Sequence, residues 1–322
     1  MNTIVTGGAG FIGSHVVERL LDAGSAVVCY DNFDDYYDPN IKRQNIKNAS
    51  GRKNFHLVEG DIRNTELLRK TFAQFAIDTV IHLAARAGVR PSLLRPDLYY
   101  DVNVMGTLSL LETMRKCNVH RMLFASSSSV YGNQSKVPFS ENDSVDQPIS
   151  PYAASKKAGE LLCHTYHHLY GFDIFCLRFF TVYGPRQRPE MAIHQFVKQM
   201  FNGETIILYG DGSSERDYTY IDDILDGIIG SLSALKGYEI INLGESRTIT
   251  LKKLISVIEN VTGKTARIRW ESMQPGDVQT TYADITKAAR IIGYRPHFPV
   301  ESGIMKFVDW YRDNYVRDIK EI

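Results

Sequence analysis

The first 31 residues limit the fold of this 322-residue chain more than any other stretch. A short β-branched run, NTIVT, leads directly into the glycine-rich segment GGAGFIG. The next segment, SHVVERLLDAG, has apolar residues at helical spacing, and the apolar run AVVCY follows and ends at Asp31. A strand, a glycine-rich turn, a helix and a second strand within about 30 residues are typical of a βαβ unit that binds a dinucleotide.

The glycines of this unit have separate expected roles. Gly7 permits the tight turn, Gly10 lets the backbone approach a pyrophosphate, and Gly13 lets the helix pack closely on the strand. Phe11 and Ile12 begin the helix, where unpaired backbone N–H groups point at the phosphates. The sequence therefore predicts that the pyrophosphate lies at the start of this helix.

Asp31, at the end of the second strand, indicates which dinucleotide binds. Its carboxylate accepts hydrogen bonds from the adenosine ribose and repels a 2′-phosphate, which favours NAD over NADP. Asn32 follows it and is expected at the same site. Lys42 and Arg43 further along leave NADP open as an alternative.

Apolar strands continue to alternate with helical patterns, which predicts an α/β fold with a Rossmann-type, doubly wound parallel sheet. Residues 1–180 are expected to form the NAD-binding domain, and residues 181–322 a smaller α/β domain for the substrate. A strand and helix near 216–243 are expected to rejoin the first domain. Further strands are predicted at 54–58, 79–83, 121–125 and 173–178, and helices at 65–75, 97–117 and 150–171.

Ligands of such sheets bind beyond the carboxyl ends of the strands. Asp61 is placed there to hold the adenine amino group, and the small side chains of Ala84 and Ala85 let the ribose and pyrophosphate lie against the strand end. His82 lies within a strand and is expected to be a core residue. The other residues assigned to the cofactor are Ile62, Leu83, Asn103 and Phe179.

Tyr152 and Lys156 belong to a predicted helix with an N-cap at Ser150, proline at its first position and a stop at Gly171. Four residues apart on a helix, their side chains share one face. A neighbouring ammonium favours the phenolate and lowers the pKa of tyrosine toward neutrality. This spacing is common by chance, so its meaning depends on the dinucleotide unit.

Composition restricts the function classes. Lys plus Arg and Asp plus Glu each number 37, so no charge excess indicates nucleic acid or anionic lipid as a partner. The four cysteines have no metal-ligand spacing, and we expect free thiols and no metal. No apolar run reaches about 18 residues, and no signal peptide is evident, so the expected location is the cytoplasm.

The motifs in chain order resemble those of extended short-chain dehydrogenases, and among them the nucleotide-sugar 4-epimerases. They are Gly7-x-x-Gly10-x-x-Gly13 with Asp31, HLAA, the serine run before VYG, Tyr152-x-x-x-Lys156 and LRFFTVYGPR. In that family a tyrosine takes the proton of the sugar 4-OH while NAD removes the hydride from C4. The 4-keto sugar then turns over and receives the hydride on its other face.

The resemblance implies roles for the residues that match. Tyr152 is the base, and Lys156 lowers its pKa and holds the nicotinamide ribose. Ser127 bridges the substrate hydroxyl and the tyrosine, while Ser128 and Ser129 contact the sugar. Relatives that dehydrate or decarboxylate their substrate carry an acid where Ser129 stands, which argues against elimination. Phe179 replaces a tyrosine of many relatives beneath the nicotinamide.

Three stretches resemble UDP-glucuronate 4-epimerases more than the hexose enzymes: DNFDDYYDPNIKRQN, HLAARAGVRPSL and FFTVYGPRQRPEMA. A hexuronate carries a carboxylate, which an arginine fork suits and which is expensive to bury unpaired. Arg186, with Thr181 nearby, is the expected carboxylate ligand. Arg90 is assigned to the carboxylate or the diphosphate.

The family pattern assigns Arg216 to phosphate and Asp277 to the uridine ribose. Thr281 stands where some hexose enzymes have a bulky gate, so UDP-glucose and UDP-N-acetylhexosamines remain alternative substrates. A non-catalytic NAD-binding scaffold is a more distant alternative. The resemblance also implies a homodimer, formed by pairing the helices at 97–117 and 150–171 of each subunit into a four-helix bundle.

Overall fold

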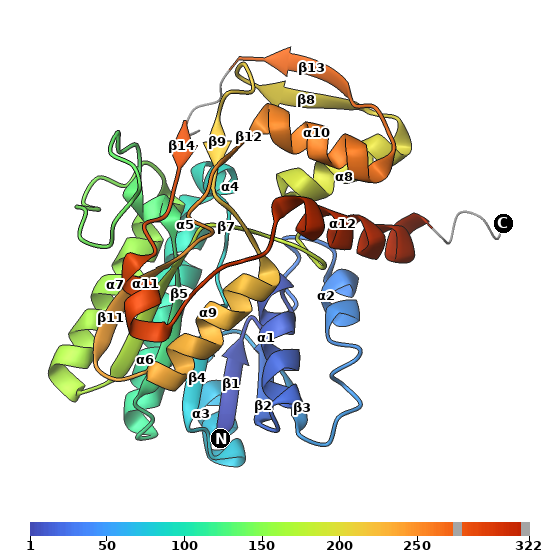
Figure 1. Cartoon of the computed structure of the whole chain (residues 1–322). Coiled ribbons are helices and arrows are strands. Elements are labelled where there is room, and N and C mark those ends of the chain that lie inside the picture. The colour runs from blue at the N-terminus through green and yellow to red at the C-terminus, as the bar shows by residue number, and fades with distance from the viewer. Residues whose placement is uncertain (273–278, 317–322) are drawn as a thin grey trace.

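A seven-stranded parallel sheet forms the centre of the larger part of the molecule, in the order β11-β6-β5-β4-β1-β2-β3 (Figure 1). The computed structural model describes residues 1–272 and 279–316. The chain runs outward from β1 to β3 and then crosses back to place β4 on the other side of β1. The predicted doubly wound sheet is confirmed. Its strands are β1 Asn2–Thr6, β2 Ala26–Asp31, β3 Phe55–Glu59, β4 Thr79–His82, β5 Arg121–Ser127, β6 Asp173–Phe179 and β11 Tyr238–Leu243.

Helices cover both faces of this sheet, as Figure 1 shows. Helices α1 (Phe11–Asp22) and α9 (Ile221–Ala234) pack together on one face. Helices α3 (Thr65–Phe75), α6 (Gly106–Lys116) and α7 (Pro151–Tyr170) cover the other. Successive side chains of a strand point to opposite faces, so Val5 and Ile4 of β1 contribute to separate apolar cores on the two faces.

The glycine-rich turn after β1 has the close contacts that the sequence predicts. Gly7 has a φ of +69°, and a Cβ there would lie 2.7 Å from the backbone nitrogen of Ala84. A Cβ on Gly13 would lie 2.1 Å from the Gly7 carbonyl oxygen. Any larger side chain at either position would force the start of α1 away from the ends of β1 and β4.

Helix α7 begins and ends where its sequence predicts. The Ser150 hydroxyl accepts a hydrogen bond from the Ala153 amide at 3.1 Å, and Pro151 occupies the first turn. Gly171 ends the helix in the left-handed conformation, at a φ of +67°. Local capping rules therefore determine the 20-residue helix that carries Tyr152 and Lys156.

The helix predicted over 97–117 is interrupted by a wider turn. It consists of α5 (Pro96–Tyr100), a π-helical segment at Asp101–Met105, and α6. Asn103 lies in this segment, and its side chain reaches the backbone of Arg86, donating to the carbonyl at 2.9 Å and accepting from the amide at 2.7 Å. The sequence contains no proline or glycine there that would have predicted the change of helix type.

The smaller part of the molecule lies beyond the carboxyl ends of the sheet, at the top of Figure 1. Its strands form small pairs and triplets: β8 with β13, β7 with β10, and β9 between β12 and β14. The chain returns once to the large sheet, through α9 and β11, before completing this part. The remaining elements of the chain are α2 Pro39–Asn45, α4 Val89–Leu94, β7 Thr181–Tyr183, α8 Ala192–Asn202, β8 Thr205–Tyr209, β9 Glu215–Arg216, β10 Tyr218–Tyr220, β12 Ile249–Thr250, α10 Leu251–Thr262, β13 Arg267–Glu271, β14 Thr280–Thr281, α11 Thr286–Ile292 and α12 Val300–Tyr311. Of these, α2 and α4 follow strands of the large sheet, and α11 packs against α9 and β11.

Candidate active site

Two cavities meet at the carboxyl ends of the sheet strands. The first, of about 210 Å³, lies over the ends of β1, β2 and β4, where the strand order reverses. The second, of about 670 Å³, extends from there into the smaller part of the molecule. Tyr36 and Arg188 line both cavities and mark where they join. A cleft at such a reversal is the usual ligand site of an open α/β sheet.

The first cavity collects the residues that the sequence assigns to the cofactor. All of them line it except Asn103, which is buried behind it and holds the backbone of Arg86 and the Ser155 hydroxyl. Asn103 therefore joins the cavity wall to α7 instead of facing the cavity. The lining residues from the sequence assignment are Gly7, Gly10, Phe11, Ile12, Gly13, Asp31, Asn32, Asp61, Ile62, Leu83, Ala84, Ala85, Tyr152, Lys156 and Phe179.

Asp31 is held firmly at the cavity wall. Its two carboxylate oxygens accept hydrogen bonds from the amides of Ala9, at 3.1 Å, and Phe33, at 2.9 Å. Burial raises the pKa of Asp31, and the nearby Lys42 ammonium opposes that rise. Arg43 does not line this cavity, because its guanidinium binds both carboxylate oxygens of Glu59 on the surface. Of the two cations that left NADP open, only Lys42 faces the cavity.

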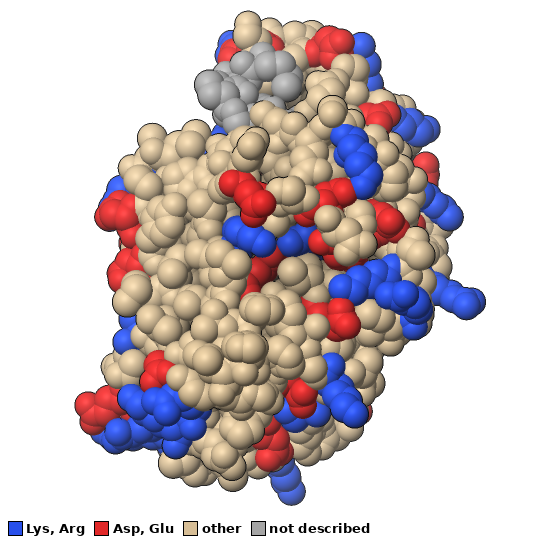
Figure 2. Space-filling view, turned by 90° about the vertical axis from the view of Figure 1, so that its left-hand side faces the viewer, with Lys and Arg blue, Asp and Glu red and all other residues tan. Residues whose placement is uncertain are grey.

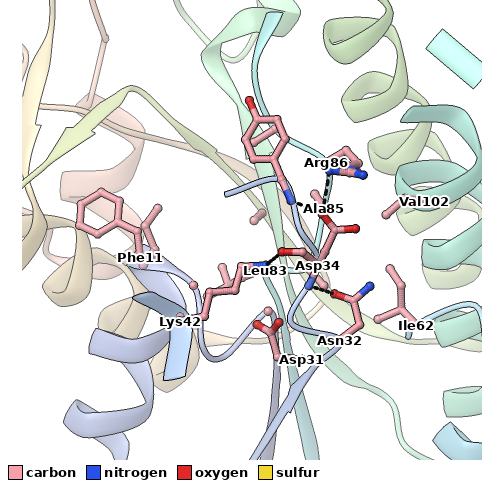
Figure 3. Close-up of a pocket in the computed structure, with 18 of the residues that line it drawn as sticks. Phe11, Asp31, Asn32, Asp34, Lys42, Ile62, Leu83, Ala85, Arg86 and Val102 are labelled. Atoms are coloured by element: carbon pink, nitrogen blue, oxygen red, sulfur yellow. Dashed lines mark hydrogen bonds and ion pairs between the residues drawn. The ribbon is translucent and has the colours of Figure 1, made fainter. Parts of the chain in front are cut away.

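An ion pair that the sequence does not predict joins two loops of the first cavity (Figure 3). Arg86, after β4, contacts the carboxylate of Asp34, after β2, at 2.7 Å. Both side chains are mostly buried, at 16% and 29% exposed, and the guanidinium lies over the Tyr36 ring. Lys42 donates to the Asp34 carbonyl at 2.9 Å. The sequence signal for this pair is an acidic residue after β2 and a basic residue after β4, because these two strands lie on either side of β1.

Tyr152 lines the first cavity together with Arg188, and it forms a hydrogen bond with Ser127. Burial raises the pKa of Tyr152, and a hydrogen bond with Ser127 and the charge of Arg188 oppose that rise. Lys156 instead donates from its ammonium to the Ala125 carbonyl at 2.8 Å, and burial lowers the pKa of Lys156 to about 8. Arg188 is therefore a cation that acts on Tyr152, and the role assigned to Lys156 in lowering the tyrosine pKa stays a prediction.

The four consecutive serines point in different directions. Ser126 donates its hydroxyl to the buried Glu160 carboxylate at 2.6 Å. The Ser127 hydroxyl caps the short 3-10 turn Ser128–Tyr131, accepting from the Ser129 amide at 3.1 Å. Ser128 and Ser129 line the second cavity. The serine run therefore joins the buried core, the tyrosine and the second cavity within four residues.

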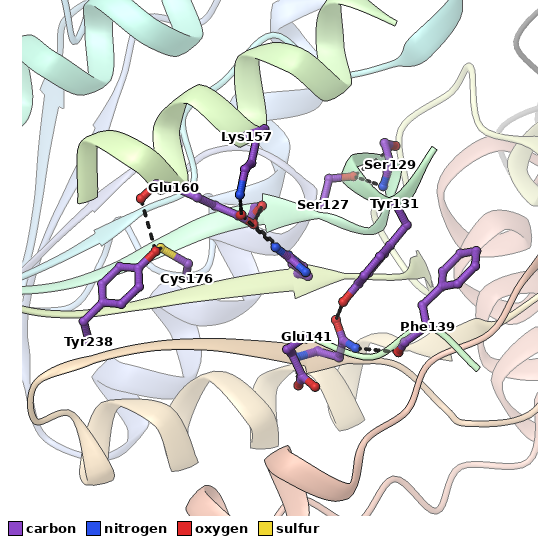
Figure 4. Close-up of polar contacts among 12 residues, drawn as sticks. Ser127, Ser129, Tyr131, Phe139, Glu141, Lys157, Glu160, Cys176 and Tyr238 are labelled. Atoms are coloured by element: carbon purple, nitrogen blue, oxygen red, sulfur yellow. Dashed lines mark hydrogen bonds and ion pairs between the residues drawn. The ribbon is translucent and has the colours of Figure 1, made fainter. Parts of the chain in front are cut away.

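A buried polar network fixes the serine run and α7 relative to each other (Figure 4). Arg178 of β6 binds both carboxylate oxygens of Glu160 on α7, at 2.8 and 2.9 Å, and both side chains are 1% exposed. The guanidinium lies 4.8 Å from the centre of the Tyr131 ring, and the Tyr131 hydroxyl donates to Asn242 of β11 at 2.7 Å. Such a network leaves the helix and both strands little freedom to shift.

The second cavity contains most of the residues that the sequence assigns to the substrate. Arg90, Ser128, Ser129, Thr181 and Arg216 line it, together with Thr281. The Arg90 guanidinium lies 4.9 Å from the centre of the Tyr209 ring. Arg216 donates to the carbonyls of Glu215, at 2.9 Å, and Gln279, at 3.2 Å. Asp277 lies outside the described residues, so the structure does not place it.

Arg186 does not reach either cavity. It binds the Glu18 carboxylate of α1 at 2.9 Å, whereas Arg188, two residues later, lines both cavities. The reason is the turn at Gly184–Arg186, where the φ values of +141° and +64° reverse the chain and direct Arg186 toward α1. Sequence motifs name both arginines of GPRQRP but do not show which side of the turn each side chain takes.

The structure also bears on His82, the cysteines, metal binding and membrane-spanning helices. His82 is buried, as predicted, and its ring nitrogens are hydrogen-bonded to the hydroxyls of Thr6 and Thr107. All four cysteines have free thiols. Within residues 1–272 and 279–316, no three His, Cys, Asp or Glu side chains are arranged to bind a metal ion. The same residues include no helix with the length and apolar character needed to cross a bilayer.

Comparison with known proteins gives relatives over the whole length. A UDP-glucuronate 4-epimerase of Thermodesulfobacterium geofontis is 46% identical over 312 residues, which cover 97% of this chain and 96% of the relative. The crystal structure of UDP-glucuronic acid 4-epimerase from Bacillus cereus, in complex with UDP-glucuronic acid and NAD, superposes with a TM-score of 0.93 at 38% identity, covering 98% and 100% of the two chains.

A dTDP-glucose 4,6-dehydratase from Streptomyces venezuelae, with NAD bound, has a TM-score of 0.91 at 32% identity and covers 98% of each chain. The family described as GDP-mannose 4,6 dehydratase matches residues 4–307. This match extends from the first strand of the dinucleotide unit into the last long helix, α12. The chain therefore belongs to the GDP-mannose 4,6 dehydratase family, which has the extended short-chain dehydrogenase fold.

Proposed function

We propose that this protein converts UDP-glucuronate to UDP-galacturonate by NAD-dependent epimerisation at C4. The observation that carries the proposal is that Tyr152, with its hydrogen bond to Ser127, lines the first cavity together with Arg188, which also lines the second cavity. A base for a sugar hydroxyl and a cation for a sugar carboxylate are thereby placed within reach of one hexuronate. The T. geofontis and B. cereus relatives carry this activity in their names.

The first cavity has the features that a dinucleotide requires. Neither Gly7 nor Gly13 has room for a side chain, so the backbone at the start of α1 remains open to a pyrophosphate. Asp31 presents a fixed carboxylate for ribose hydroxyls. NAD, when bound, accepts the C4 hydride and returns it, so the reaction is redox-neutral overall.

Tyr152 performs the proton transfer in this proposal. Its phenolate removes the proton of the 4-OH as the C4 hydride leaves, which gives a 4-keto sugar, and it returns the proton after the keto sugar has turned over. Ser127 hydrogen-bonds to Tyr152 and lowers its pKa, so it favours the phenolate and guides the hydroxyl. Lys156, anchored on the Ala125 carbonyl, lines the cavity and holds the nicotinamide ribose.

Arg188 and Thr181 are assigned to the carboxylate of the hexuronate. Both line the second cavity, and a guanidinium presents the fork that a planar carboxylate requires. Hydrogen bonds to charged groups contribute about 1.5–3 kcal/mol, which corresponds to roughly ten- to hundredfold discrimination against a neutral sugar. Arg90 and Arg216 lie further along the same cavity, where they are available to the diphosphate. Asp277 remains our proposal for the uridine ribose.

Ser129 supports epimerisation over elimination. Dehydration needs an acid or base near C5 and C6, and the residue before Val130 is a serine whose amide and hydroxyl are bonded to Ser127. A hydroxyl at this position provides no carboxyl group to remove a C5 proton. This distinguishes the proposed reaction from that of the S. venezuelae dehydratase with the same fold.

Incubation of the purified protein with a panel of UDP-sugars tests the function. We expect UDP-glucuronate to give UDP-galacturonate, separated by anion-exchange chromatography, with little turnover of UDP-glucose or UDP-N-acetylglucosamine. Turnover of a neutral sugar without any galacturonate would favour the alternative substrates. A non-catalytic scaffold would turn over none of these sugars, and Tyr152→Phe would leave that result unchanged.

We also propose that the protein acts in the cytoplasm as a homodimer. Exposed apolar side chains gather on the face formed by α4 to α7, and Figure 2 shows a broad uncharged area there. Two copies joined through this face would bury it in a symmetric helical bundle. The four free thiols support the proposed cytoplasmic location, because the cytoplasm is a reducing compartment. A monomer mass by light scattering at micromolar concentration would contradict the dimer. The exposed residues are Leu93, Leu94, Tyr100, Met105, Leu161, Leu169 and Tyr170.

A further inference from the structure

Arg186 has three unusual features for a residue outside both cavities. Its backbone is left-handed, at a φ of +64°, which a non-glycine residue adopts only at a cost in energy. Its guanidinium is mostly buried, at 16% exposed, against a Glu18 carboxylate that is 22% exposed. Its Nη1 atom has no hydrogen-bond partner. Surrounding contacts must therefore hold this conformation in place.

Those contacts come from α1, the helix whose first turn faces the pyrophosphate. Glu18 binds Arg186 at 2.9 Å, and one turn earlier His15 donates from Nε2 to the Pro185 carbonyl at 2.9 Å. Burial and the Arg186 charge lower the pKa of His15 to about 4, so its ring is neutral and the hydrogen bond persists at neutral pH. Adjacent residues of the turn are therefore attached to one helix at two points.

The other side of the turn is held as well. The Gln187 amide donates to the Gly184 carbonyl at 3.1 Å, and His194 of α8 donates from Nδ1 to the Gln187 carbonyl at 2.7 Å. Arg188 follows directly and enters both cavities, with its Nε donating to Glu190 at 2.6 Å. Only two peptide units separate the Arg186 anchor from Arg188, which lines the first cavity together with Tyr152.

We propose that the Glu18–Arg186 ion pair is a specificity-determining clamp, which positions Arg188 against the sugar carboxylate by tying its turn to α1. Glu18 and Arg186 are positioning residues, because neither touches a cavity. The clamp joins α1 to the turn that carries Arg188. Displacement of this turn therefore weakens the binding of an acidic sugar more than the binding of a neutral sugar. This inference rests on the proposed function.

Equilibrium binding to full-length protein carrying Tyr152→Phe, which stops turnover, provides the test. Isothermal titration with UDP-glucuronate and with UDP-glucose gives two dissociation constants for each added variant. We expect Arg188→Met to weaken UDP-glucuronate roughly ten- to hundredfold and UDP-glucose little. Arg186→Met and Glu18→Gln are expected to weaken UDP-glucuronate several-fold with the same selectivity. Arg186→Lys keeps a cation for Glu18 and is expected to recover part of the loss.

A double-mutant comparison separates positioning from general stabilisation. If the clamp acts through Arg188, Arg186→Met has no further effect on UDP-glucuronate binding in a chain that already carries Arg188→Met. Arg19→Met is the matched control, since Arg19 is the next residue of α1 and pairs with Asp226 at 2.9 Å on the surface. The control is expected to leave both dissociation constants unchanged. Melting temperature and NAD content confirm that each variant is folded.

Each contrary result has a separate meaning. Equal weakening of both sugars by Arg186→Met, or effects of Arg186→Met and Arg188→Met that simply add, would overturn the clamp and leave the function intact. An Arg188→Met variant that binds UDP-glucuronate as tightly as its parent would overturn both the role of Arg188 and the clamp that depends on it. Activity of the unmodified protein on UDP-glucuronate tests the function independently of either.

Discussion

The Ser127 hydroxyl contacts three groups: the Ser129 amide, which donates to it, the Ser129 hydroxyl, and Tyr152. At the scale of single residues, this hydroxyl and the Arg188 charge are the two groups that counteract the effect of burial on Tyr152. Burial alone would keep the phenol protonated at neutral pH, where it is a poor base. The environment of the tyrosine therefore determines its reactivity as much as the residue type.

The first prediction concerns Ser127→Ala. The Ser127 hydrogen bond lowers the pKa of Tyr152, so its loss raises that pKa. The rise of kcat with increasing pH is therefore expected to occur at higher pH in the variant. We expect kcat at pH 7 to fall roughly ten- to hundredfold, as for the loss of one hydrogen bond to a charged group. The pH profile of kcat measures both effects.

Ser126→Ala is the matched control for this measurement. The Ser126 hydroxyl donates to Glu160 and has no bond to Tyr152 among those described. We expect this variant to lose some thermal stability and to keep the rise of kcat at the same pH. If the rise of kcat with pH shifts equally in both variants, the serines affect activity only by stabilising the fold and not by a direct effect of Ser127 on Tyr152.

At the scale of elements, two loops that follow β2 and β4 line the first cavity and are joined by Asp34 and Arg86. The π-helical segment before α6 supports this ion pair, because the Asn103 side chain forms hydrogen bonds with the backbone of Arg86 and with the Ser155 hydroxyl of α7. The loop after β4 is thereby connected to α7, the helix that carries Tyr152. A wider helical turn is one way to direct a side chain sideways into such a contact.

The second prediction concerns cofactor retention. A redox-neutral reaction does not require the dinucleotide to leave, and the Asp34–Arg86 pair closes two walls of its cavity. We expect Arg86→Gln and Asp34→Asn each to speed the loss of NAD about fivefold, which corresponds to about 1 kcal/mol for a partly exposed ion pair. The NAD remaining after timed gel filtration, read by absorbance, measures this loss.

Arg43→Gln provides the control for the same experiment. Arg43 belongs to α2 and forms an ion pair with Glu59, but both side chains are about half exposed, at 50% and 53%, and lie outside the cavity. The variant is expected to retain NAD as the unmodified protein does. If it loses NAD as fast as Arg86→Gln, the effect belongs to general loosening of the region and not to the ion pair.

At the scale of the whole molecule, a cluster of carboxyl groups lies where the chain passes between its two parts. Glu245 follows β11, Asp223 lies in α9, and the Asp223 carboxylate accepts hydrogen bonds from the amides of His297, at 3.1 Å, and Phe298, at 3.0 Å. Burial, together with the charges of Asp223 and Asp217, raises the pKa of Glu245 to about 8, while Arg247 opposes the rise. Burial also raises the pKa of Asp217 to about 6.

The third prediction follows from this cluster. The folded chain holds a proton on Glu245 that the unfolded chain releases above its ordinary pKa of 4.5, so the free energy of unfolding falls as pH rises from about 4.5 to about 8. Glu245→Gln removes this pH-dependent contribution to the free energy of unfolding. We expect the variant to gain a few degrees in melting temperature at pH 8 relative to the unmodified chain, and to gain less at pH 5.

Differential scanning calorimetry across this pH range checks the third prediction. Glu66→Gln is the comparison, because Glu66 is exposed, pairs with Lys70, and has a lowered pKa, so it stays ionised throughout the range. Its effect on melting temperature is expected to be the same at pH 5 and pH 8. A Glu245→Gln effect that is equally flat would show that this carboxyl group does not hold a proton in the folded protein.

Short-range rules explain how much of the protein is readable from its sequence. Periodicity and capping predicted the parallel sheet and the ends of α7. Because the carboxyl ends of parallel strands meet at one edge, nearly all the residues assigned to the cofactor line one cavity. These features depend on neighbours within a few positions, or on a topology that permits few alternatives.

Only the tertiary structure decided which groups act on each other across that edge. Arg188 lines the same cavity as Tyr152, whereas Arg186 pairs with Glu18, because a left-handed turn sends side chains two residues apart in opposite directions. The ammonium of Lys156 goes to the Ala125 carbonyl, because burial requires that each of its polar contacts be satisfied locally. Side-chain direction across turns and between distant segments follows from packing of the complete chain, and no local pattern encodes it.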